Sequence, residues 1–381
     1  MKLGLVTHYM PPHHGGIERI ALDHAVAAAA AGFEVRWVAS RAPSSGSRRE
    51  TMAWGEARRV PCINAFETSL GVPYPLWSAA GRREIRDLVE WSDVVHVHDV
   101  LYPGTSLALD AARRARRPTL LTQHIGLVPY RSFVLNAIQR MAYRTIGRRN
   151  GRRATAWAYY NEGARDWLRA VCNASPPSVF LPNGVDTELF RPVADAAEKR
   201  SLRERFGLPV DRMVVLFVGR LVFKKGADVV VGAAHSAHHI VLVGERGNVE
   251  IGGHPGVELR PFVERKELSE LMRACDVFAL PSRGEGFPLT AQEAMASGLA
   301  VILSNDPTYP AQVDVGAALF IEPAAASLAD SLARLDRTPG ERIELGRRAR
   351  ENAHRMWSLS ACRQRLVAVY GQLGQTGSLR T

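Results

Sequence analysis

The chain is poor in cysteine and has no long apolar run. Its four cysteines among 381 residues are widely separated and lack metal-ligand spacing, which suits a reducing compartment and no disulfide framework. No apolar stretch is long enough to cross a bilayer, and the first residues do not resemble a signal peptide. We therefore expect a cytoplasmic protein that is soluble or peripheral on the inner face of the cell membrane.

Acidic residues are almost missing from one segment. The whole chain carries a formal net charge of +11. Between Gly104 and Arg153, a single acid, Asp110, stands against eleven arginines, which gives +10 for this segment alone. The arginines are Arg113, Arg114, Arg116, Arg117, Arg131, Arg140, Arg144, Arg148, Arg149, Arg152 and Arg153. Such a patch attracts phosphate-bearing surfaces such as nucleic acid, anionic lipid or phosphorylated glycolipid.

These arginines fall into two groups. The four from Arg113 to Arg117 end a predicted helix, where the helix dipole favours cations whatever the function. Three others stack at four-residue spacing on one predicted helix, opposite apolar positions: Arg140, Arg144 and Arg148, opposite Val134, Ile138 and Met141. Like charges at this spacing repel by roughly 0.2–0.5 kcal/mol per pair, and an external anion would relieve that repulsion. We hypothesise that this face contacts anionic membrane or a lipid diphosphate acceptor, although an arginine-rich genome would give the same composition.

Short apolar strands alternate with helical stretches along the whole chain, and they form two series. The first expected series is 2–8, 34–40, 93–99, 118–124, 155–160 and 179–182. The second is 213–219, 240–243, 276–280, 300–304 and 318–321. Strands separated by helices predict βαβ units and parallel sheets, and the chain is long enough for two cores. The sequence thus predicts an α/β protein with two Rossmann-like doubly wound domains, whose ligands bind at the carboxyl ends of the strands in the cleft between them.

Turn residues mark the domain boundaries. Asn183-Gly184 predicts a turn after the first series of strands, and Pro192 prevents a strand from continuing. We expect an N-terminal domain over 1–183, a C-terminal domain over 184–355, and a last helical segment over 356–381.

One stretch, from Pro281 to Gly298, reads as a binding site. A short apolar strand ends at Pro281, a glycine-rich turn follows, and a helix begins after Pro288 and ends at Gly298. Such a junction directs free backbone N–H groups and the positive end of a helix dipole at one spot, which suits a phosphate. Glu285 in the turn and Glu293 in the helix would flank the bound group and face hydroxyls, which sugars and ribose supply.

Two glutamates separated by seven residues within Glu-Gly-Phe-Pro-Leu resemble the signature of glycosyltransferase family 4, whose members are retaining, nucleotide-sugar-dependent enzymes of the GT-B fold. The resemblance implies that Glu285 contacts the transferred sugar and that Glu293 contacts the nucleotide ribose. It implies that backbone groups of Gly286, Phe287 and Leu289 hold the diphosphate. Pro288 has no N–H to donate where other members carry glycine. The Pro-Asn-Gly-Val-Asp element after Leu181 and a last helix that returns to the first domain fit the same family.

Arg220 and Lys225 follow a buried strand in Gly-Arg-Leu-Val-Phe-Lys-Lys-Gly, so both should emerge at its carboxyl end. Arginine offers a fork for two phosphate oxygens and lysine offers a point charge. Each charge-assisted bond contributes roughly 1.5–3 kcal/mol, which would favour a departing diphosphate. The family resemblance assigns both cations to the diphosphate. The resemblance also implies that Gly16, in the Gly-Gly turn after the first strand, contacts the diphosphate.

His124 ends the strand over 118–124 and is our candidate catalytic residue beside Glu285. The resemblance implies that a histidine here lies against the donor sugar. His98 ends the preceding strand and is a weaker candidate for the acceptor side. A metal site is not predicted, because His8, His13 and His14 lack a carboxylate partner at metal-like spacing. We expect neither a cofactor nor a metal.

Gly244, Arg260 and Phe262 are weak candidates for nucleoside contacts. The turn Gly-Glu-Arg-Gly at 244–247 departs from the Gly-Asp/Glu-Gly turn usual in the family. The sequence therefore does not predict which nucleotide base the donor carries. Overall we expect a metal-independent retaining hexosyltransferase whose partners are a nucleotide-sugar donor, a cell-envelope glycan or glycolipid acceptor, and an anionic membrane surface as a candidate. Nucleic acid is not expected. The alternatives are a glycan phosphorylase or nucleotide-sugar epimerase, and a basic nucleic-acid or membrane adaptor without turnover.

Overall fold

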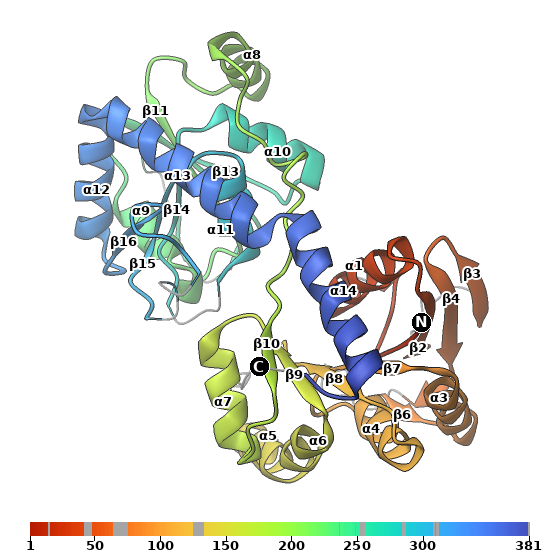
Figure 1. The fold of residues 1–381 in the computed structure, drawn as a ribbon. Helices are drawn as coiled ribbons and strands as arrows, with labels where there is room; N and C mark the ends of the chain where they lie inside the picture. The colour runs from red at the N-terminus through yellow and green to blue at the C-terminus, as the bar shows by residue number, and fades with distance from the viewer. Residues whose placement is uncertain are drawn as a thin grey trace. The chain divides into compact units, whose positions relative to one another are not determined.

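The computed structural model describes most of the chain. The described residues are 1–13, 16–41, 48–63, 75–124, 133–235, 237–247, 249–251, 254, 256–283, 287–307, 309 and 312–379. They form two compact units. The N-terminal unit comprises Met1–Pro182 together with Arg363–Thr381, and the C-terminal unit comprises Asn183–Cys362 (Figure 1).

The N-terminal unit is built on an eight-stranded sheet in the order β10-β9-β8-β7-β1-β2-β4-β3. Its strands are β1 (Lys2–Thr7), β2 (Glu34–Ser40), β3 (Arg49–Met52), β4 (Gly55–Val60), β7 (Val94–His98), β8 (Thr119–Thr122), β9 (Ala156–Tyr159) and β10 (Ser178–Phe180). Only β3 pairs antiparallel among these described strands. A separate two-stranded sheet pairs β5 (Cys62–Ile63) with β6 (Leu76–Trp77). The central strands β1, β7 and β8 are buried along almost their whole length, as expected for parallel strands that helices cover on both faces.

Helices cover both faces of this sheet. They are α1 (Gly16–Ala30), α3 (Ala79–Trp91), α4 (Pro103–Ala115), α5 (Phe133–Ala142), a π-helical turn (Tyr143–Gly147), α6 (Arg148–Arg153), α7 (Glu162–Cys172) and α14 (Leu359–Thr376). Alternation along β1 divides the core, since Leu5 belongs to the cluster under α1 and α14, whereas Val6 belongs to the cluster under α3 and α4. Side chains of successive strand residues point to opposite faces, so one strand supplies both cores.

The end of the chain packs into the N-terminal unit. The helix expected over 356–373 is α14, which begins after a break at Ser358. Its buried residues include Leu366, Tyr370 and Leu373, which join the core under α1. Tyr370 Oη lies 2.7 Å from His96 Nδ1 on β7. The first and last parts of the chain therefore share one hydrophobic core.

The C-terminal unit has a six-stranded sheet in the order β13-β12-β11-β14-β15-β16, with every described pair parallel. Its strands are β11 (Met213–Val218), β12 (His238–Val243), β13 (Val257–Arg260), β14 (Val277–Leu280), β15 (Ala300–Ser304) and β16 (Leu319–Ile321). Its helices are α8 (Ala196–Phe206), a 3-10 turn (Phe223–Lys225), α9 (Ala227–Gly232), α10 (Arg265–Ala274), α11 (Leu289–Ala296), α12 (Ala325–Arg337) and α13 (Pro339–Trp357). β11 and β14 are neighbours, although about 60 residues separate them, so the loops that follow them start side by side.

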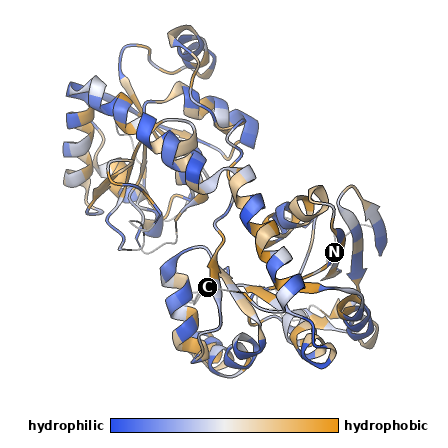
Figure 2. Ribbon diagram, viewed as in Figure 1, coloured by the Kyte–Doolittle hydropathy of each residue, from blue (hydrophilic) through white to orange (hydrophobic). Residues whose placement is uncertain are grey.

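Hydrophobic residues concentrate on the strands of both sheets, while the helices carry hydrophilic residues on one side (Figure 2). This is the distribution that layered α/β units produce. In the part of the chain that the structure describes, no helix combines the length and the apolarity needed to cross a membrane.

Sequence reasoning missed several strands, and most of the expected strands are shorter than predicted by one or more residues. β3, β4, β5, β6 and β13 were not expected. β3 (RETM) and β4 (GEARRV) are rich in charge, so no apolar run marks them. β8 ends at Thr122, two residues before the predicted end at 124. His124 therefore lies in the segment after the strand rather than on it.

Candidate active site

The loop after β11 carries two of the predicted phosphate ligands. Arg220 is exposed and follows directly after the strand, and Lys225 is half-buried on the 3-10 turn. Leu221 between them is fully buried and fixes the loop to the core. Both cations thus stand at the carboxyl end of a central parallel strand, which is the edge where such sheets bind ligands.

Arg283, which was not predicted as a site residue, ties this loop to the one that follows β14. Its guanidinium forms a two-pronged ion pair with Asp228, with both N–O distances 2.9 Å. It also donates to the backbone oxygen of Phe223 at 2.6 Å and lies over the Phe223 ring at 3.8 Å. Its own backbone N–H donates to the oxygen of Lys224. Arg283, at the start of the loop after β14, is therefore fixed against the loop after β11.

Gly226 is required where these loops meet. Its φ is +75°, and a Cβ at this position would lie 2.1 Å from the backbone oxygen of Pro281. Only glycine combines this backbone conformation with such a close approach. The glycine that follows Lys225 is thus required by the structure, and it also matches the family pattern.

Helix α11 follows the second loop, and Glu293 lies within it. Pro288 precedes the helix without a side-chain cap. The Glu293 side chain is only 5% exposed, and its Oε1 lies 3.3 Å from Arg265 Nη2 on α10. A ribose hydroxyl would have to share this carboxylate with the guanidinium.

The remaining predicted residues of this motif have mixed outcomes. Glu285 and Gly286 fall outside the described residues. Leu289 is the first residue of α11 and is partly exposed. The Phe287 ring stacks on Trp357 at 4.8 Å and meets Tyr309 edge-on at 5.1 Å. This ring anchors the segment, so only the backbone of Phe287 is left to meet a ligand.

The three weak nucleoside candidates line one cavity of about 400 Å³ in the C-terminal unit. Gly244 follows β12. Arg260 is the last residue of the neighbouring strand β13, and Phe262 lies two residues further on. Arg260 is held by Glu258 at 2.7 Å and by the backbone oxygen of Phe206 at 2.5 Å. Phe262 is 72% exposed and offers its ring to a planar group.

In the N-terminal unit, His124 joins a chain of partly buried hydrogen bonds. His124 Nε2 lies 2.7 Å from His98 Nδ1, and His124 Nδ1 contacts Tyr160 Oη. Burial lowers the pKa of His124 well below its ordinary value, and His24 and His8 add to that effect. His124 is therefore a neutral imidazole whose two nitrogens are oriented by partners. Sequence reasoning had no signal for Tyr160, which is 36 residues away along the chain.

Asp99 adds a carboxyl group beside this chain. It follows β7 with φ of +67°, and its Oδ1 accepts from Gln123 Nε2 at 2.5 Å. Its Oδ2 is buried without a partner. Burial raises the pKa of Asp99 to about 7, while the hydrogen bond from Gln123 opposes that rise. The strand expected over 93–99 ended at Asp99, but no role was predicted for this residue.

His8 and His13 were expected to lack a carboxylate partner, and this expectation was wrong. These residues do have a carboxylate partner, because Glu18 Oε1 lies 3.0 Å from His13 Nδ1 and 3.4 Å from His8 Nε2. Spacing along the chain concealed this contact, since Glu18 returns on α1. Gly16 is the first residue of α1, as expected for a turn that opens a helix, and His14 falls outside the described residues.

The arginine-bearing helix differs from its prediction. A π-helical turn follows α5 where one continuous helix was expected, and the apolar side chains of α5 are exposed. The exposed fractions are 79% for Phe133, 63% for Val134, 58% for Ile138 and 60% for Met141. Arg140, Arg144 and Arg148 are exposed as well. Exposed apolar and exposed basic side chains therefore both lie on this helical segment.

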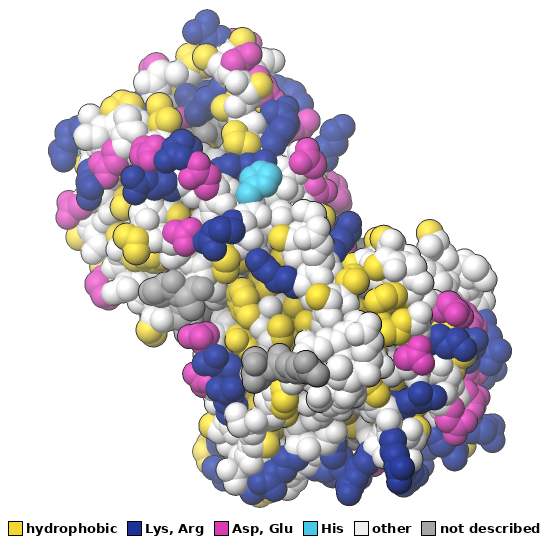
Figure 3. All heavy atoms as spheres, viewed as in Figure 1, with side chains coloured by type: hydrophobic (Ala, Val, Ile, Leu, Met, Phe, Trp, Pro, Cys, Tyr) yellow, Lys and Arg dark blue, Asp and Glu magenta, His cyan; other side chains and the backbone are white. Residues whose placement is uncertain are grey.

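Other arginines of this segment surround a hollow of about 530 Å³. It is lined by Arg113, Arg149, Arg152 and Arg153. Asp110 pairs with Arg149 and Arg153. In Figure 3, dark blue side chains gather along the lower edge of the N-terminal unit, where α4, α5 and α6 lie in Figure 1.

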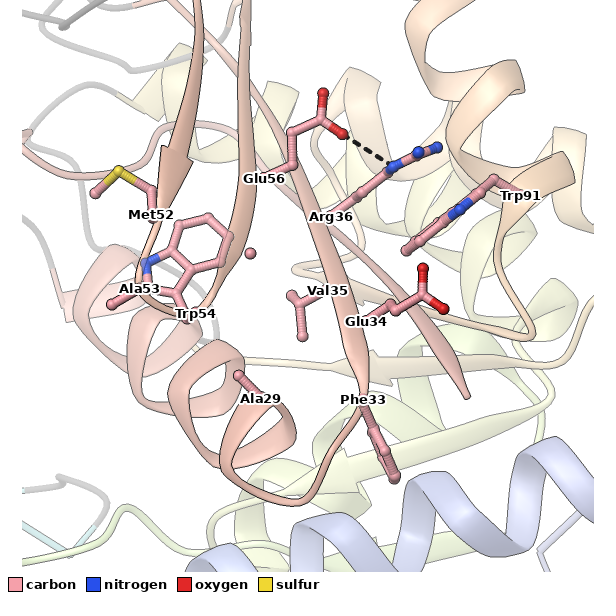
Figure 4. Close-up of a pocket in the computed structure, with 11 residues that line it drawn as sticks. Ala29, Phe33, Glu34, Val35, Arg36, Met52, Ala53, Trp54, Glu56 and Trp91 are labelled. Atoms are coloured by element: carbon pink, nitrogen blue, oxygen red, sulfur yellow. Dashed lines mark ion pairs between the residues drawn. The ribbon is translucent and has the colours of Figure 1, made fainter.

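A second cavity of about 530 Å³ lies away from the predicted chemistry. It is found at the start of β2, beside Trp54 and Trp91 (Figure 4). Arg36 extends between Glu56, 3.0 Å away, and the Trp91 ring, 4.0 Å away. None of its lining residues was predicted as functional, and it is at the opposite end of the sheet from His124.

Comparison with known proteins relates these features to a family. The family described as Glycosyltransferase Family 4 matches residues 14–189, and that described as Glycosyl transferases group 1 matches residues 198–356. The D-inositol 3-phosphate glycosyltransferase of Xylanimonas cellulosilytica is 32% identical, over 74% of this chain and 72% of that protein. The enzyme of the same name from Saccharomonospora viridis is 32% identical over 50% and 49% of the two chains.

Solved structures agree on the fold. HepE of Anabaena, determined in complex with UDP, has a TM-score of 0.76 at 17% identity, with 98% of this chain and 100% of that chain covered. The sucrose-phosphate synthase of Thermosynechococcus elongatus has a TM-score of 0.72 at 21% identity, with 98% of each chain covered. Two parallel α/β units with these neighbours show that the fold is GT-B. Within that fold class, the chain belongs to glycosyltransferase family 4, also described as glycosyl transferases group 1.

Proposed function

We propose that the protein is a retaining hexosyltransferase that moves a sugar from a nucleoside diphosphate donor to a hydroxyl of a cell-envelope glycan or glycolipid. The observation that carries the proposal is the pair of loops after β11 and β14, which are locked together by Arg283. These loops bring Arg220 and Lys225 to the strand ends beside the segment that leads to Glu293.

The cations supply the charge that the donor needs. Arg220 and Lys225 would neutralise the diphosphate as the sugar bond breaks, because negative charge grows on the leaving group. We propose that this pair replaces a divalent ion, which makes the transfer metal-independent. Glu293 would accept hydrogen bonds from the ribose, and the cavity beside Gly244 and Phe262 would hold the base.

His124 and Glu285 would act on the sugar. His124 is a neutral imidazole held by Tyr160 and His98, so it can hydrogen-bond a hydroxyl without bringing a fixed charge. Glu285 would contact the transferred hexose. The family resemblance supports retention, with the departing phosphate assisting deprotonation of the acceptor on the same face.

A transfer assay tests this function. The protein is incubated with UDP, GDP and ADP sugars, first alone and then with envelope glycolipids or inositol phosphate as acceptors. The proposal predicts release of nucleoside diphosphate only with an acceptor, with the anomeric configuration kept in the product. An epimer or a sugar phosphate formed from donor alone would instead indicate the epimerase or phosphorylase alternative.

We also propose that the acceptor is reached at an anionic membrane surface. The exposed apolar side chains of α5 lie on the same helix as Arg140 and are followed by Arg144 and Arg148. An exposed apolar and basic helix suits the boundary between headgroups and acyl chains. Each arginine near such a surface contributes about 1 kcal/mol.

Vesicle flotation tests the membrane contact. Wild type should float with anionic vesicles at low salt and should not float with neutral ones. The double variant Ile138→Ser/Met141→Ser should lose most of this binding, whereas Ile343→Ser should not. Ile343 is a matched control because it is 71% exposed on α13 of the C-terminal unit. Equal recovery from both kinds of vesicle would contradict the proposal.

A further inference from the structure

Three histidines of the N-terminal unit gather in one place, and only His98 among them was a candidate, as a weak one for the acceptor side. His24 comes from α1, and His96 and His98 come from β7. Residues two apart on a strand point to the same face, so both β7 rings meet the helix that covers it. One ring nitrogen from each histidine lies within 4.8 Å of those of the other two.

Two of these imidazoles have a buried nitrogen with no partner. They are Nδ1 of His24 and Nε2 of His98, and the whole His98 side chain is fully buried. Buried polar atoms are normally hydrogen-bonded, so each exception calls for an explanation. Two such atoms in one cluster indicate that a third body belongs between them.

The surrounding contacts suit metal ligands. A histidine that binds a metal usually hydrogen-bonds through its other nitrogen, which fixes the ring. His98 has this second contact, to His124 at 2.7 Å. His96 contacts Tyr370 Oη at Nδ1 and Thr122 Oγ1 at Nε2, both at 2.7 Å. Binding an ion through either nitrogen of His96 would displace one hydroxyl and keep the other as the orienting partner.

We propose that His24, His96 and His98 bind a divalent transition-metal ion, Zn²⁺ in the first place. Zn–N distances of about 2.0–2.1 Å in a tetrahedral site put ligand nitrogens about 3.3 Å apart. The rings therefore have to close by no more than about 1.5 Å. Imidazole is a preferred ligand of zinc. The half-buried position of His24 leaves an approach from its side.

The ion would clamp α1 onto β7 and would also set the proton positions up to His124. With Nε2 of His98 on the metal, its Nδ1 must carry the proton and donate to His124 Nε2. Neutral His124 must then carry its own proton on Nδ1, directed at Tyr160 Oη. Without the metal, the opposite direction of both bonds is equally allowed. The proposed site lies wholly within the N-terminal unit and does not rest on the donor being bound by Arg220 and Lys225.

Metal binding to the untagged, full-length protein tests the proposal. Wild type is loaded with Zn²⁺, passed over a chelating resin and analysed for retained metal. We expect about one equivalent, a higher thermal midpoint, and the same result for His354→Leu, whose imidazole is exposed on α13. His24→Leu should bind zinc at least 10- to 100-fold more weakly, which is the loss that even outer-shell partners cause.

A second measurement on wild type alone covers the case in which His24→Leu does not fold. X-ray absorption at the zinc edge should show three imidazole nitrogens on the retained ion. Retention no greater than in a chelator-treated blank, equal retention by folded His24→Leu, or a zinc environment with fewer than two imidazoles would each overturn the proposal.

Discussion

Burial decides the behaviour of His8. Its ring is 6% exposed and stacks on Tyr102 at 4.2 Å. Burial lowers the pKa of His8 from 6.5 to about 3, and His13 adds to the effect. Glu18 lies 3.4 Å away and would favour a charged ring, but His13 already holds the same carboxylate oxygen at 3.0 Å.

The pH dependence of stability follows from this shift. Below pH 6.5, His8 binds a proton in the unfolded chain but not in the folded one. The stability of the fold with neutral His8 is therefore fully present above pH 6.5 and is lost as the pH falls toward 3. We predict a smaller pH effect on His8→Phe, which keeps the stacking. Between pH 6.5 and pH 4.5 its free energy of unfolding should fall by about 2–3 kcal/mol less than that of wild type. Urea unfolding at both pH values measures this difference. His235→Phe, which removes an exposed histidine, should behave as wild type, and equal losses in all three proteins would contradict the account.

Single residues at strand ends were visible in the sequence, but their partners were not. Arg220 and Lys225 stand out because a cation after an apolar strand emerges at a known edge of the sheet. Tyr160 and Arg283 act through residues 36 and 55 positions away, and no local pattern marks such contacts. The same reason hid Glu18 from the argument about His8 and His13.

The loops after β11 and β14 approach each other closely at Gly226. We predict that Gly226→Ala destabilises the C-terminal unit by at least about 2 kcal/mol, because the left-handed backbone is strained and the methyl group collides with the oxygen of Pro281. The matched change Gly340→Ala meets nothing within 4 Å and should stabilise by about 0.4–1 kcal/mol. Thermal unfolding compares the two. A neutral Gly226→Ala would show that the loops do not need this approach.

Elements were predictable where their pattern was strong. The apolar strands β1, β11 and β14 are buried along their length and were expected within a residue or two. The edge strand β3 pairs with β4, and ion pairs such as Arg58 on β4 with Glu84 on α3 add to this part of the sheet. A helix was expected at α5, but its pattern did not show that none of its residues is buried.

Across the whole molecule, the two units differ in how the chain completes them. The N-terminal unit needs the last helix, since Leu366, Val369, Tyr370 and Leu373 are buried in it. At roughly 1.5–3 kcal/mol for each large buried side chain, their loss rivals the whole stability of a typical domain. We predict that deletion of 363–381 unfolds the N-terminal unit and spares the C-terminal one. Limited proteolysis with mass spectrometry should recover a fragment starting near Asn183, and an intact N-terminal fragment would contradict this.

The two-unit α/β architecture was predictable at the scale of the molecule, because alternating strands and helices recur in two series. Family membership followed from the spacing of Glu285 and Glu293 together with the Arg220 and Lys225 loop. The base and the acceptor depend on cavity shape and on side chains such as Phe262, which periodicity does not encode.

The central claim is that the C-terminal unit grips a nucleoside diphosphate through Arg220 and Lys225. Calorimetric titration of UDP, GDP and ADP tests it most directly, with wild type, Arg220→Ala/Lys225→Ala, and the neighbouring exposed Lys224→Ala as control. The account predicts that at least one nucleotide binds wild type, that Lys224→Ala stays within about twofold, and that the double variant weakens binding by more than about 100-fold. Unchanged affinity in the double variant, or no binding of any of the three to wild type, would contradict it.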